Sequence, residues 1–219
     1  MAYSQLQDVL SACVNPDRKE QMERYMRNQF IFLGVATPQR RSATKGLLRM
    51  LCKESSINWE FVDACWSSPE REYQYVGVDY LWQVREMLQP SDLLQLRRLI
   101  ETKSWWDTVD TLFVVVGSLV ERFPHLKSDM LSWSLDNHLW VRRVAICFQL
   151  KFKTNTDTDL LRQVILNNAE HNDFFIRKAI GWILREYSKT NPVWVSEFIT
   201  QYGERLSNLS IREGCKYIK

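Results

Sequence analysis

The strongest constraint on the fold of this chain is a helical pattern that recurs every 35 residues. The stretch WVRRVAI at 140–146 aligns with FIRKAIG at 175–181, so an aromatic, a branched aliphatic and two basic residues recur in the same order. A further step toward the N-terminus places Trp105 at the position of Trp140, and a fainter copy, EYQYVGVDYLW, lies at 72–82. Such a period, with two helices per unit, is typical of helical-repeat proteins, whose helical pairs bury their apolar faces against their neighbours. Chance similarity among amphipathic helices is the alternative explanation.

The rest of the chain also favours helices over strands. Between 104 and 121, most apolar residues are three or four positions apart and trace a single helical face. Only seven glycines occur, and no segment alternates apolar and polar residues over the length of a strand. Three capping residues stand directly before a proline, the pattern of a helix start, and they are Thr37, Ser68 and Asn191. We therefore predict an all-α chain.

The sequence carries no signature of nucleotide, metal or membrane binding. It contains neither GxGxxG nor GxxxxGKS/T, and its three histidines lie far apart without the spacing of zinc ligands. Its longest apolar stretch, TLFVVVGSLV, is too short to cross a bilayer. Five cysteines without a CxxC pair, and an N-terminus unlike a signal peptide, indicate unpaired thiols in a reducing compartment. We expect a cytoplasmic protein that uses no metal or other cofactor.

Charge is distributed unevenly along the chain. The net charge of +3 is too small to indicate nucleic-acid binding by itself. Residues 1–50, however, hold eight Lys and Arg against four Asp and Glu, and residues 136–189 hold nine against six. Residues 51–135 hold eight against thirteen. Two basic ends around an acidic middle suit a surface that binds an anion at its rims.

The stretch TKSWWDTVD at 102–110 brings two tryptophans and two acids within about one helical turn. Trp106 and Asp110 lie over one another on a helix, on a stripe turned by about 100° from that of Trp105. We predict that Trp105 packs inward and that Trp106 lies at the edge of a free face. Simple packing and a surface hydrogen bond explain Trp106 and Asp110, but so does a site for a cation, which an indole face and a carboxylate both attract. Asp107, the competing acid, suits the helix start.

A basic stripe runs along the helix expected at 173–189. Lys178, Arg185 and Lys189 surround Trp182 at intervals of four, three and four positions, and Arg143 aligns with Lys178 in the preceding repeat. A solvated helix face also carries lysines and arginines, but an exposed tryptophan among them is harder to explain by solvation. The stripe therefore indicates a surface that binds a phosphate backbone through cations and an aromatic ring.

The N-terminal part contributes a weaker basic signal. Arg40 and Arg41 fall in the first turn of an expected helix, where the free amides also favour an anion. Tyr25, Arg27 and Lys45 lie nearby in the sequence. We predict that Tyr25, Arg40 and Arg41 add contacts to such a phosphate backbone.

Four stretches closely resemble the bacterial AlkD-type DNA glycosylases, and they are RYMRNQFIFLGVATPQRR, TKSWWDTVD, VRRVAICFQLKFK and IRKAIGWILREYSKTNP. The likeness runs in the same order through nearly the whole chain. It implies one domain over residues 1–219, a right-handed superhelical α-solenoid of HEAT-like helical pairs with a concave DNA-binding face. It also implies a base-excision repair hydrolase that releases cationic N3- and N7-alkylated purines, such as 3-methyladenine and 7-methylguanine, from duplex DNA. We expect a monomer without lyase activity and without a base-flipping pocket.

The resemblance also assigns roles to individual residues. The catalytic aspartate of the family falls on Asp110, and its two site tryptophans fall on Trp106 and Trp182. The arginine that contacts phosphate falls on Arg143, and three further residues match positions near DNA, namely Tyr25, Gln149 and Arg185. A helical-repeat scaffold that binds DNA or protein without catalysis is the alternative. It explains the fold and the charges, but not why Trp106, Asp110, Arg143 and Trp182 occur together.

Overall fold

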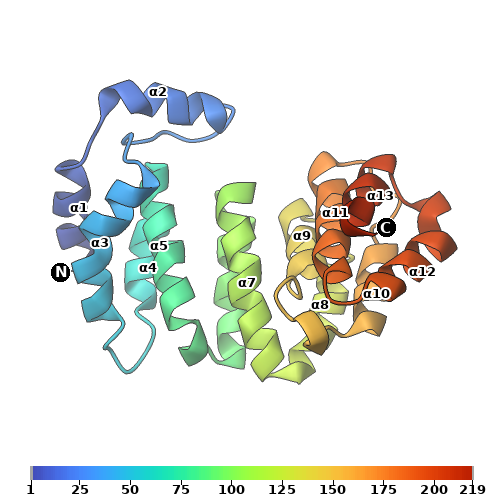
Figure 1. Cartoon of the computed structure of the whole chain (residues 1–219). Coiled ribbons are helices and arrows are strands. Elements are labelled where there is room, and N and C mark those ends of the chain that lie inside the picture. The colour runs from blue at the N-terminus through green and yellow to red at the C-terminus, as the bar shows by residue number, and fades with distance from the viewer. Residues whose placement is uncertain (1, 219) are drawn as a thin grey trace. The chain divides into compact units, whose positions relative to one another are not determined.

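The computed structural model describes residues 2–218, and within this range the chain is helical. It contains thirteen α-helices and six short 3-10 helices, with a single isolated β-bridge between Ile31 and Glu70 and no strand. The prediction of an all-α chain is therefore confirmed. The chain divides into two compact units, Met1–Leu88 and Gln89–Lys219 (Figure 1). That both belong to one domain over residues 1–219 stays a prediction.

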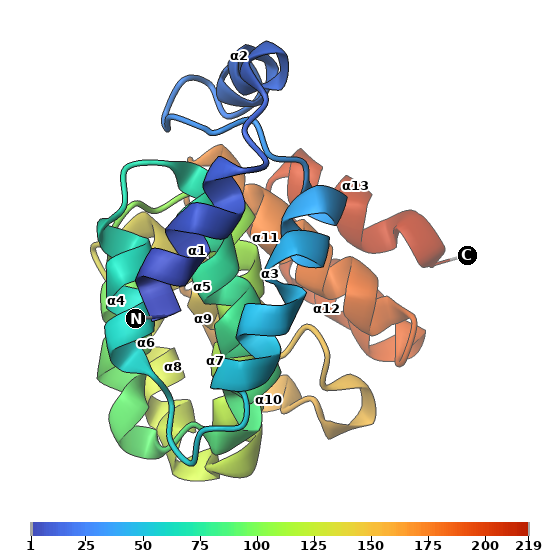
Figure 2. The ribbon, with the colours of Figure 1, turned by 90° about the vertical axis from the view of Figure 1, so that its left-hand side faces the viewer.

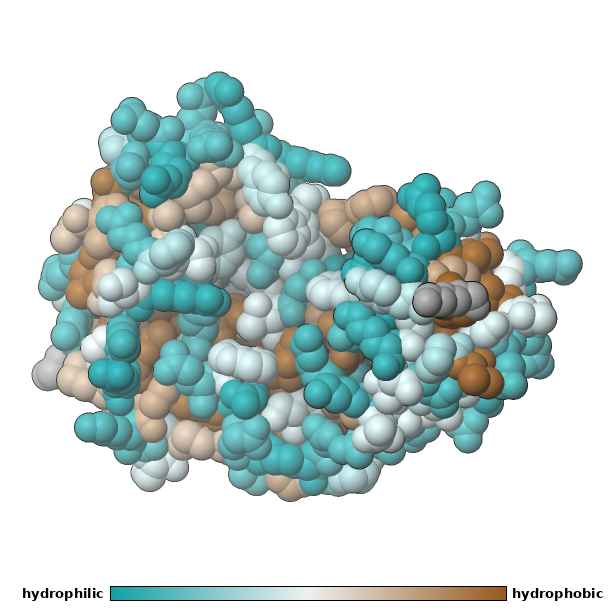
Figure 3. All heavy atoms as spheres, in the orientation of Figure 1, coloured by the Kyte–Doolittle hydropathy of each residue, from teal (hydrophilic) through white to brown (hydrophobic). Residues whose placement is uncertain are grey.

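The first unit is a small helical bundle with one outlying helix. Helices α1, α3, α4 and α5 pack on one another, whereas α2 buries none of its residues and stands apart from them in Figures 1 and 2. Hydrophilic side chains cover α2 in Figure 3. The helices are α1 (Ala2–Ser11), α2 (Pro16–Tyr25), α3 (Thr37–Leu51), α4 (Trp59–Ser67) and α5 (Arg71–Val84), followed by η1 (Arg85–Met87).

A buried carboxylate holds the loop between α2 and α3. Glu72, in the first turn of α5, accepts hydrogen bonds from the backbone N–H groups of Leu33, Gly34 and Val35 at 2.9–3.0 Å. Burial raises the pKa of the Glu72 carboxyl, and these backbone hydrogen bonds lower it. Gly34 has φ +82°, and a Cβ there would lie 2.0 Å from the carbonyl oxygen of Asn15. The loop conformation therefore depends on this glycine.

The second unit contains the three helices that carry the repeat. Helices α7, α9 and α11 pack in succession, α6 contacts both α7 and α9, and α8 contacts α9. Its α-helices are α6 (Leu93–Glu101), α7 (Trp106–Arg122), α8 (Lys127–Trp133), α9 (Leu139–Cys147), α10 (Thr158–Leu166), α11 (Phe174–Ser188), α12 (Pro192–Tyr202) and α13 (Asn208–Gly214). Its 3-10 helices are η2 (Pro90–Asp92), η3 (Pro124–Leu126), η4 (Lys153–Asn155), η5 (Gly203–Arg205) and η6 (Cys215–Tyr217).

Residues 35 positions apart are physical neighbours in this unit. The rings of Trp105, Trp140 and Phe175 form one cluster, with centroid distances of 5.6 Å, 5.2 Å and 4.8 Å. Each of these residues lies at or near the start of α7, α9 or α11. The predicted repeat register therefore corresponds to contacts between successive helices. Trp105 packs against Trp140 and Phe175 through its ring, but it is half-buried, as Trp106 is.

Two of the three expected helix starts are found, and one is wrong. Thr37 is the first residue of α3, but the capping position is Ala36, which makes no side-chain cap hydrogen bond. Asn191 caps α12 by accepting a hydrogen bond from the N–H of Trp194 at 3.0 Å. Ser68 instead follows the end of α4, and α5 begins only at Arg71. The Ser68 hydroxyl donates to the carbonyl of Ala64 at 2.8 Å, so it closes the preceding helix rather than capping the next one.

Helices α7 and α9 approach closely at Gly117. A Cβ added to Gly117 would lie 2.2 Å from the carbonyl oxygen of Phe148, which directly follows α9. We expect Gly117→Ala to lower the free energy of unfolding by about 1–3 kcal/mol, because backbone atoms cannot yield as a flexible side chain would. Chemical denaturation measures this. The control is Gly46→Ala in α3, where an added Cβ would meet no atom within 4 Å beyond the nearby backbone of its own helix, so alanine should be neutral or stabilising. Equal effects of the two substitutions would contradict the close approach.

None of the helices in residues 2–218 has the length and apolar character that crossing a membrane requires.

Candidate functional site

The centre of the candidate site is an ion pair between Asp110 on α7 and Arg143 on α9. Arg143 Nε donates to Asp110 Oδ1 and Arg143 Nη2 donates to Asp110 Oδ2, each at 2.8 Å. Arg143 Nη1 donates to the backbone carbonyl of Phe175, at the start of α11, at 2.7 Å. One guanidinium thus joins three helices and fixes the plane of the carboxylate, as bidentate pairs do.

The two partners differ in their exposure. Arg143 is only 3% exposed, whereas the Asp110 side chain keeps 20% of its surface accessible. Burial raises the pKa of the Asp110 carboxyl above its usual range, and the hydrogen bonds and charge of Arg143 oppose this rise. Burial lowers the pKa of the Arg143 guanidinium, but the contacts with Asp110 outweigh that effect and raise it. Arg143 therefore stays charged and favours the carboxylate form of Asp110.

Two of the three predicted catalytic residues are brought together through Arg143. Trp182 on α11 lies with its ring centroid 5.9 Å from the guanidinium carbon of Arg143 and meets the ring of Phe113 edge-on at 5.5 Å. Trp106 begins α7, one turn before Asp110, and is half-buried. The helical period places Trp106 on the same face of α7 as Asp110. Asp110 and Trp182 both contact Arg143, whereas Trp106 is placed beside Asp110 only by the helical period of α7.

The environment of Arg143 differs from the one that the sequence predicted. It was expected to project toward a phosphate, but it is buried and three of its N–H groups bind Asp110 and Phe175. The repeat alignment aligned it with Lys178 but could not show that its partner, Asp110, lies on the preceding repeat helix, α7. Its geometry suits a residue that positions Asp110.

The basic stripe on α11 is less free than its sequence suggested. Lys178 Nζ and Arg185 Nη1 both bind the carboxylate of Glu213 on α13, at 2.8 Å and 2.5 Å. Lys189 Nζ binds Glu186 at 2.7 Å. All three cations of this stripe thus have an acidic partner. The sequence did not identify Glu213 as a partner because its helix is remote in the sequence.

Gln149 holds a loop rather than lying at the surface. Its side chain is buried, its Nε2 donates to the carbonyl of Asp157 at 3.2 Å, and its Oε1 accepts from the N–H of Asp157 at 2.7 Å. Both ends of the amide are therefore occupied by the backbone that leads into α10. We do not include Gln149 among the residues proposed to contact DNA.

The predicted DNA-binding residues of the first unit are also of two kinds. Arg40 is buried, binds Asp79 at 3.1 Å and lies over the ring of Tyr75. Arg41 is exposed and binds the other carboxylate oxygen of Asp79 at 3.2 Å. Tyr25 ends α2 and is 70% exposed. Arg40 is therefore structural, whereas Arg41 and Tyr25 are accessible to a ligand.

A basic groove between α3 and α5 extends the accessible set. Arg41, Lys45 and Arg49 follow one another at intervals of four on α3, and the groove of about 360 Å³ is also lined by Trp82 and Gln83 of α5. Lys45 and Arg49 make no ion pair within residues 2–218. Trp82 is exposed. The spacing of four was the signal in the sequence that could have identified this stripe.

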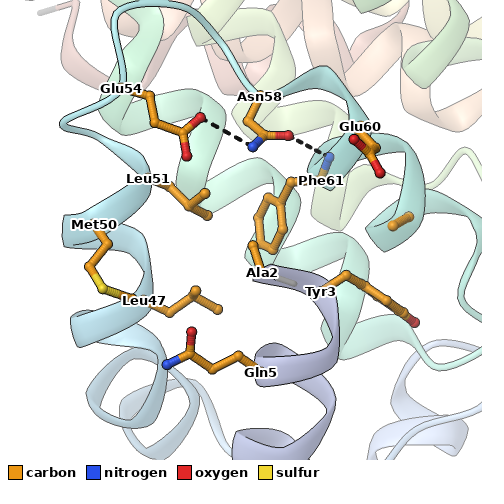
Figure 4. Close-up of a pocket in the computed structure, with 11 residues that line it drawn as sticks. Ala2, Tyr3, Gln5, Leu47, Met50, Leu51, Glu54, Asn58, Glu60 and Phe61 are labelled. Carbon is orange, nitrogen blue, oxygen red and sulfur yellow. Dashed lines mark hydrogen bonds between the residues drawn. The ribbon is translucent and has the colours of Figure 1, made fainter.

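A second hollow in the first unit has the opposite character. It lies between α1, α3 and α4, has a volume of about 400 Å³, and combines apolar side chains with Glu54 and Glu60 (Figure 4). Glu54 accepts a hydrogen bond from Asn58 Nδ2 at 3.1 Å, and Asn58 Oδ1 accepts one from the N–H of Phe61 at 2.9 Å. No Lys, Arg or His lines this hollow, so it does not suit a phosphate.

Across the described part of the chain, no cluster of three or more His, Cys, Asp or Glu side chains has the arrangement of a metal site.

Comparison with known proteins gives a consistent result. Residues 6–218 match the family model for DNA alkylation repair enzymes. A solved structure from Enterococcus faecalis, described as a predicted DNA alkylation repair enzyme, is 35% identical in sequence. The match covers 94% of this chain and 96% of that one, with a TM-score of 0.87. No curated protein sequence gave a significant match.

Proposed function

Because the chain belongs to the DNA alkylation repair enzyme family, we propose that it is a monofunctional DNA glycosylase acting on N3- and N7-alkylated purines in duplex DNA. The observation that carries this proposal is the partly exposed carboxylate of Asp110, held by a buried arginine that also contacts Trp182. In this proposal, helical pairs stack into a right-handed solenoid over residues 1–219, the concave face binds DNA, and the protein acts as a monomer. The succession of α7, α9 and α11 supports the stacking.

The charge of the substrate explains why so few catalytic groups suffice. A purine alkylated at N3 or N7 is already cationic, so the bond between its nitrogen and C1′ breaks without an acid to protonate the leaving base. The electron pair of that bond neutralises the base, and positive charge moves to the deoxyribose. A water molecule then adds to C1′ and loses a proton. The catalyst must therefore stabilise a cation more strongly in the transition state than in the ground state.

Asp110 and the two tryptophans supply that stabilisation. The carboxylate places negative charge beside the developing oxocarbenium ion, and it can orient the attacking water, as carboxylates do in glycoside hydrolysis. Indole faces attract the same positive charge. Arg143 binds both carboxylate oxygens and makes Asp110 less basic, so we assign Asp110 mainly an electrostatic role. The lesion is engaged through its sugar and backbone, without a pocket for a flipped base.

A catalytically inactive scaffold is the second candidate. One observation favours it, namely that both oxygens of Asp110 are already bound by Arg143, as in a purely structural ion pair. Single-turnover release of 7-methylguanine from duplex DNA separates the two functions. We expect release well above the uncatalysed rate. If the protein binds the duplex but releases neither 7-methylguanine nor 3-methyladenine, the result would favour the scaffold.

The basic groove of the first unit should contribute to DNA affinity. We expect the double variant Lys45→Ala and Arg49→Ala to flatten the dependence of log K on log salt concentration by about two units, roughly 0.9 per phosphate contact. Fluorescence anisotropy with undamaged duplex measures this slope. The control is Lys53→Ala, an exposed lysine of the same unit outside the groove. If the double variant has the same slope as this control, the groove does not contact phosphate.

A further inference from the structure

One carboxylate in the second unit binds two cations that the sequence predicted for DNA. Glu213 Oε1 binds Lys178 at 2.8 Å, and Glu213 Oε2 binds Arg185 at 2.5 Å. Lys178 precedes Trp182 by one helical turn and Arg185 follows it by nearly one turn, so the two cations lie on either side of this tryptophan along α11. Glu213 therefore affects the charge directly beside a proposed catalytic residue.

The backbone of α13 holds Glu213 in this position. A Cβ added to Gly181 would lie 2.6 Å from Cβ of Glu213 and 3.1 Å from the carbonyl oxygen of Ser210, so α11 and α13 are in direct backbone contact. Ser210 Oγ also donates to the carbonyl of Arg177 at 2.8 Å. Because the stem of Glu213 is fixed at this crossing, its carboxylate has little freedom to leave the two cations.

The two cations nevertheless remain accessible. The side chains of Lys178 and Arg185 are 36% and 23% exposed, and that of Glu213 is 17% exposed. The hydrogen bond from Lys178 lowers the pKa of the Glu213 carboxyl below its usual range. Burial opposes this effect, and the charges of Lys178 and Arg185 add to it. Glu213 is thus ionised at neutral pH, and the three side chains together carry one net positive charge rather than two.

We propose that Glu213 is an internal competitor of the DNA backbone, so that a phosphate binds Lys178 and Arg185 only by replacing or sharing this carboxylate. This inference rests on the proposed function, since it assumes that α11 faces DNA. Glu213 occupies both cations in the free protein, and fewer counterions are therefore released when DNA binds. The affinity for undamaged DNA is kept low beside Trp182, where tight binding to every phosphate would slow the search for lesions.

The test compares Glu213→Gln with Glu197→Gln. The first substitution removes the carboxylate charge but keeps its size and an acceptor oxygen. The second removes the same charge from an exposed position on α12 that has no ion pair in the described residues. With undamaged duplex at low salt, we expect E213Q to bind on the order of fivefold more tightly than E197Q. Its salt slope should be steeper by about 1 to 2.

The outcomes separate this inference from the function on which it rests. A salt slope of E213Q equal to that of E197Q, while the wild type still excises 7-methylguanine, overturns the competition and leaves the glycosylase in place. If the wild type does not bind duplex at all, both the competition by Glu213 and the glycosylase function are wrong. A loss of affinity in E213Q, with unchanged slope, assigns Glu213 a purely structural role and also overturns the inference.

A second variant is used if circular dichroism shows that E213Q is not folded. Glu213→Asp keeps the charge but is shorter by one methylene, so it cannot span Lys178 and Arg185 together. We expect its salt slope to be steeper than that of the wild type, because one cation is released. An unchanged slope in folded E213D overturns the proposal.

Discussion

Asp110→Asn is expected to bind alkylated duplex as the wild type does, but to release 7-methylguanine about 10²–10³-fold more slowly in a single turnover. The expected loss is that of a preorganised electrostatic group acting on the transition state. Binding should persist because Asp110 is not part of the cationic surface. The Asn side chain keeps one oxygen that can accept a hydrogen bond from Arg143, but it leaves the buried guanidinium without a counter-charge. Circular dichroism must therefore show that the variant is folded at the assay temperature.

The matched control for this variant is Asp107→Asn. Asp107 lies in the first turn of the same helix, where its Oδ1 accepts a hydrogen bond from the N–H of Thr108 at 3.0 Å, and it makes no hydrogen bond to Arg143. We expect D107N to change the excision rate by less than about threefold, the usual scale of a surface charge. Equal rates for D110N and the wild type on bound substrate would move the chemistry to another residue.

Arg143→Gln is expected to show opposite pH dependences of activity and stability. The contacts of Arg143 lower the pKa of Asp110 and burial raises it, so removal of Arg143 leaves burial unopposed. The pKa of Asp110 in the folded variant should therefore lie above that in the wild type. As the pH falls, the carboxylate is lost earlier, and the acid limb of the single-turnover rate should move to higher pH. A pH–rate profile of bound substrate measures this shift.

The stability of R143Q should depend on pH in the opposite sense, so that its deficit relative to the wild type becomes smaller as the pH falls. A carboxyl whose folded pKa is raised favours the protonated form, so its stabilising contribution is present below the unfolded pKa and is lost as the pH rises through the folded pKa. We expect R143Q to be less stable than the wild type by about 3–5 kcal/mol near neutral pH, the cost of breaking a buried ion pair. Chemical denaturation at several pH values should show this difference shrinking toward acid pH.

Arg142→Gln is the control for the pH experiments. Arg142 is the neighbour of Arg143, but it donates to Asn168 Oδ1 at 3.1 Å and to backbone carbonyls, not to Asp110. Loss of these bonds should reduce stability without moving the acid limb of the rate. If R142Q and R143Q shift the profile equally, or if R143Q does not shift it, the pairing does not tune Asp110.

Two kinds of feature could be predicted, namely those that recur with a regular period along the chain and those that depend on neighbours within a few positions. The 35-residue spacing of Trp105, Trp140 and Phe175 became a ring cluster, and Asn191 caps a helix as its sequence indicates. Where the prediction failed, at Ser68, the hydroxyl binds the carbonyl of Ala64 in the preceding helix. Sequence patterns do not show which of two local partners a side chain will bind.

The candidate site shows the limit of such patterns. Its residues were identified by resemblance and by helical spacing, yet no sequence pattern indicated that Arg143 would be buried against Asp110 rather than exposed to a phosphate. Nor did it show that Glu213 would bind Lys178 and Arg185 across a crossing that Gly181 permits. The helices, the repeat and the family could be predicted from the chain itself, because periodicity and motifs are visible in the order of the residues. Which charges are paired was decided by tertiary structure, because an ion pair requires two helices to cross at the distance that both side chains can reach.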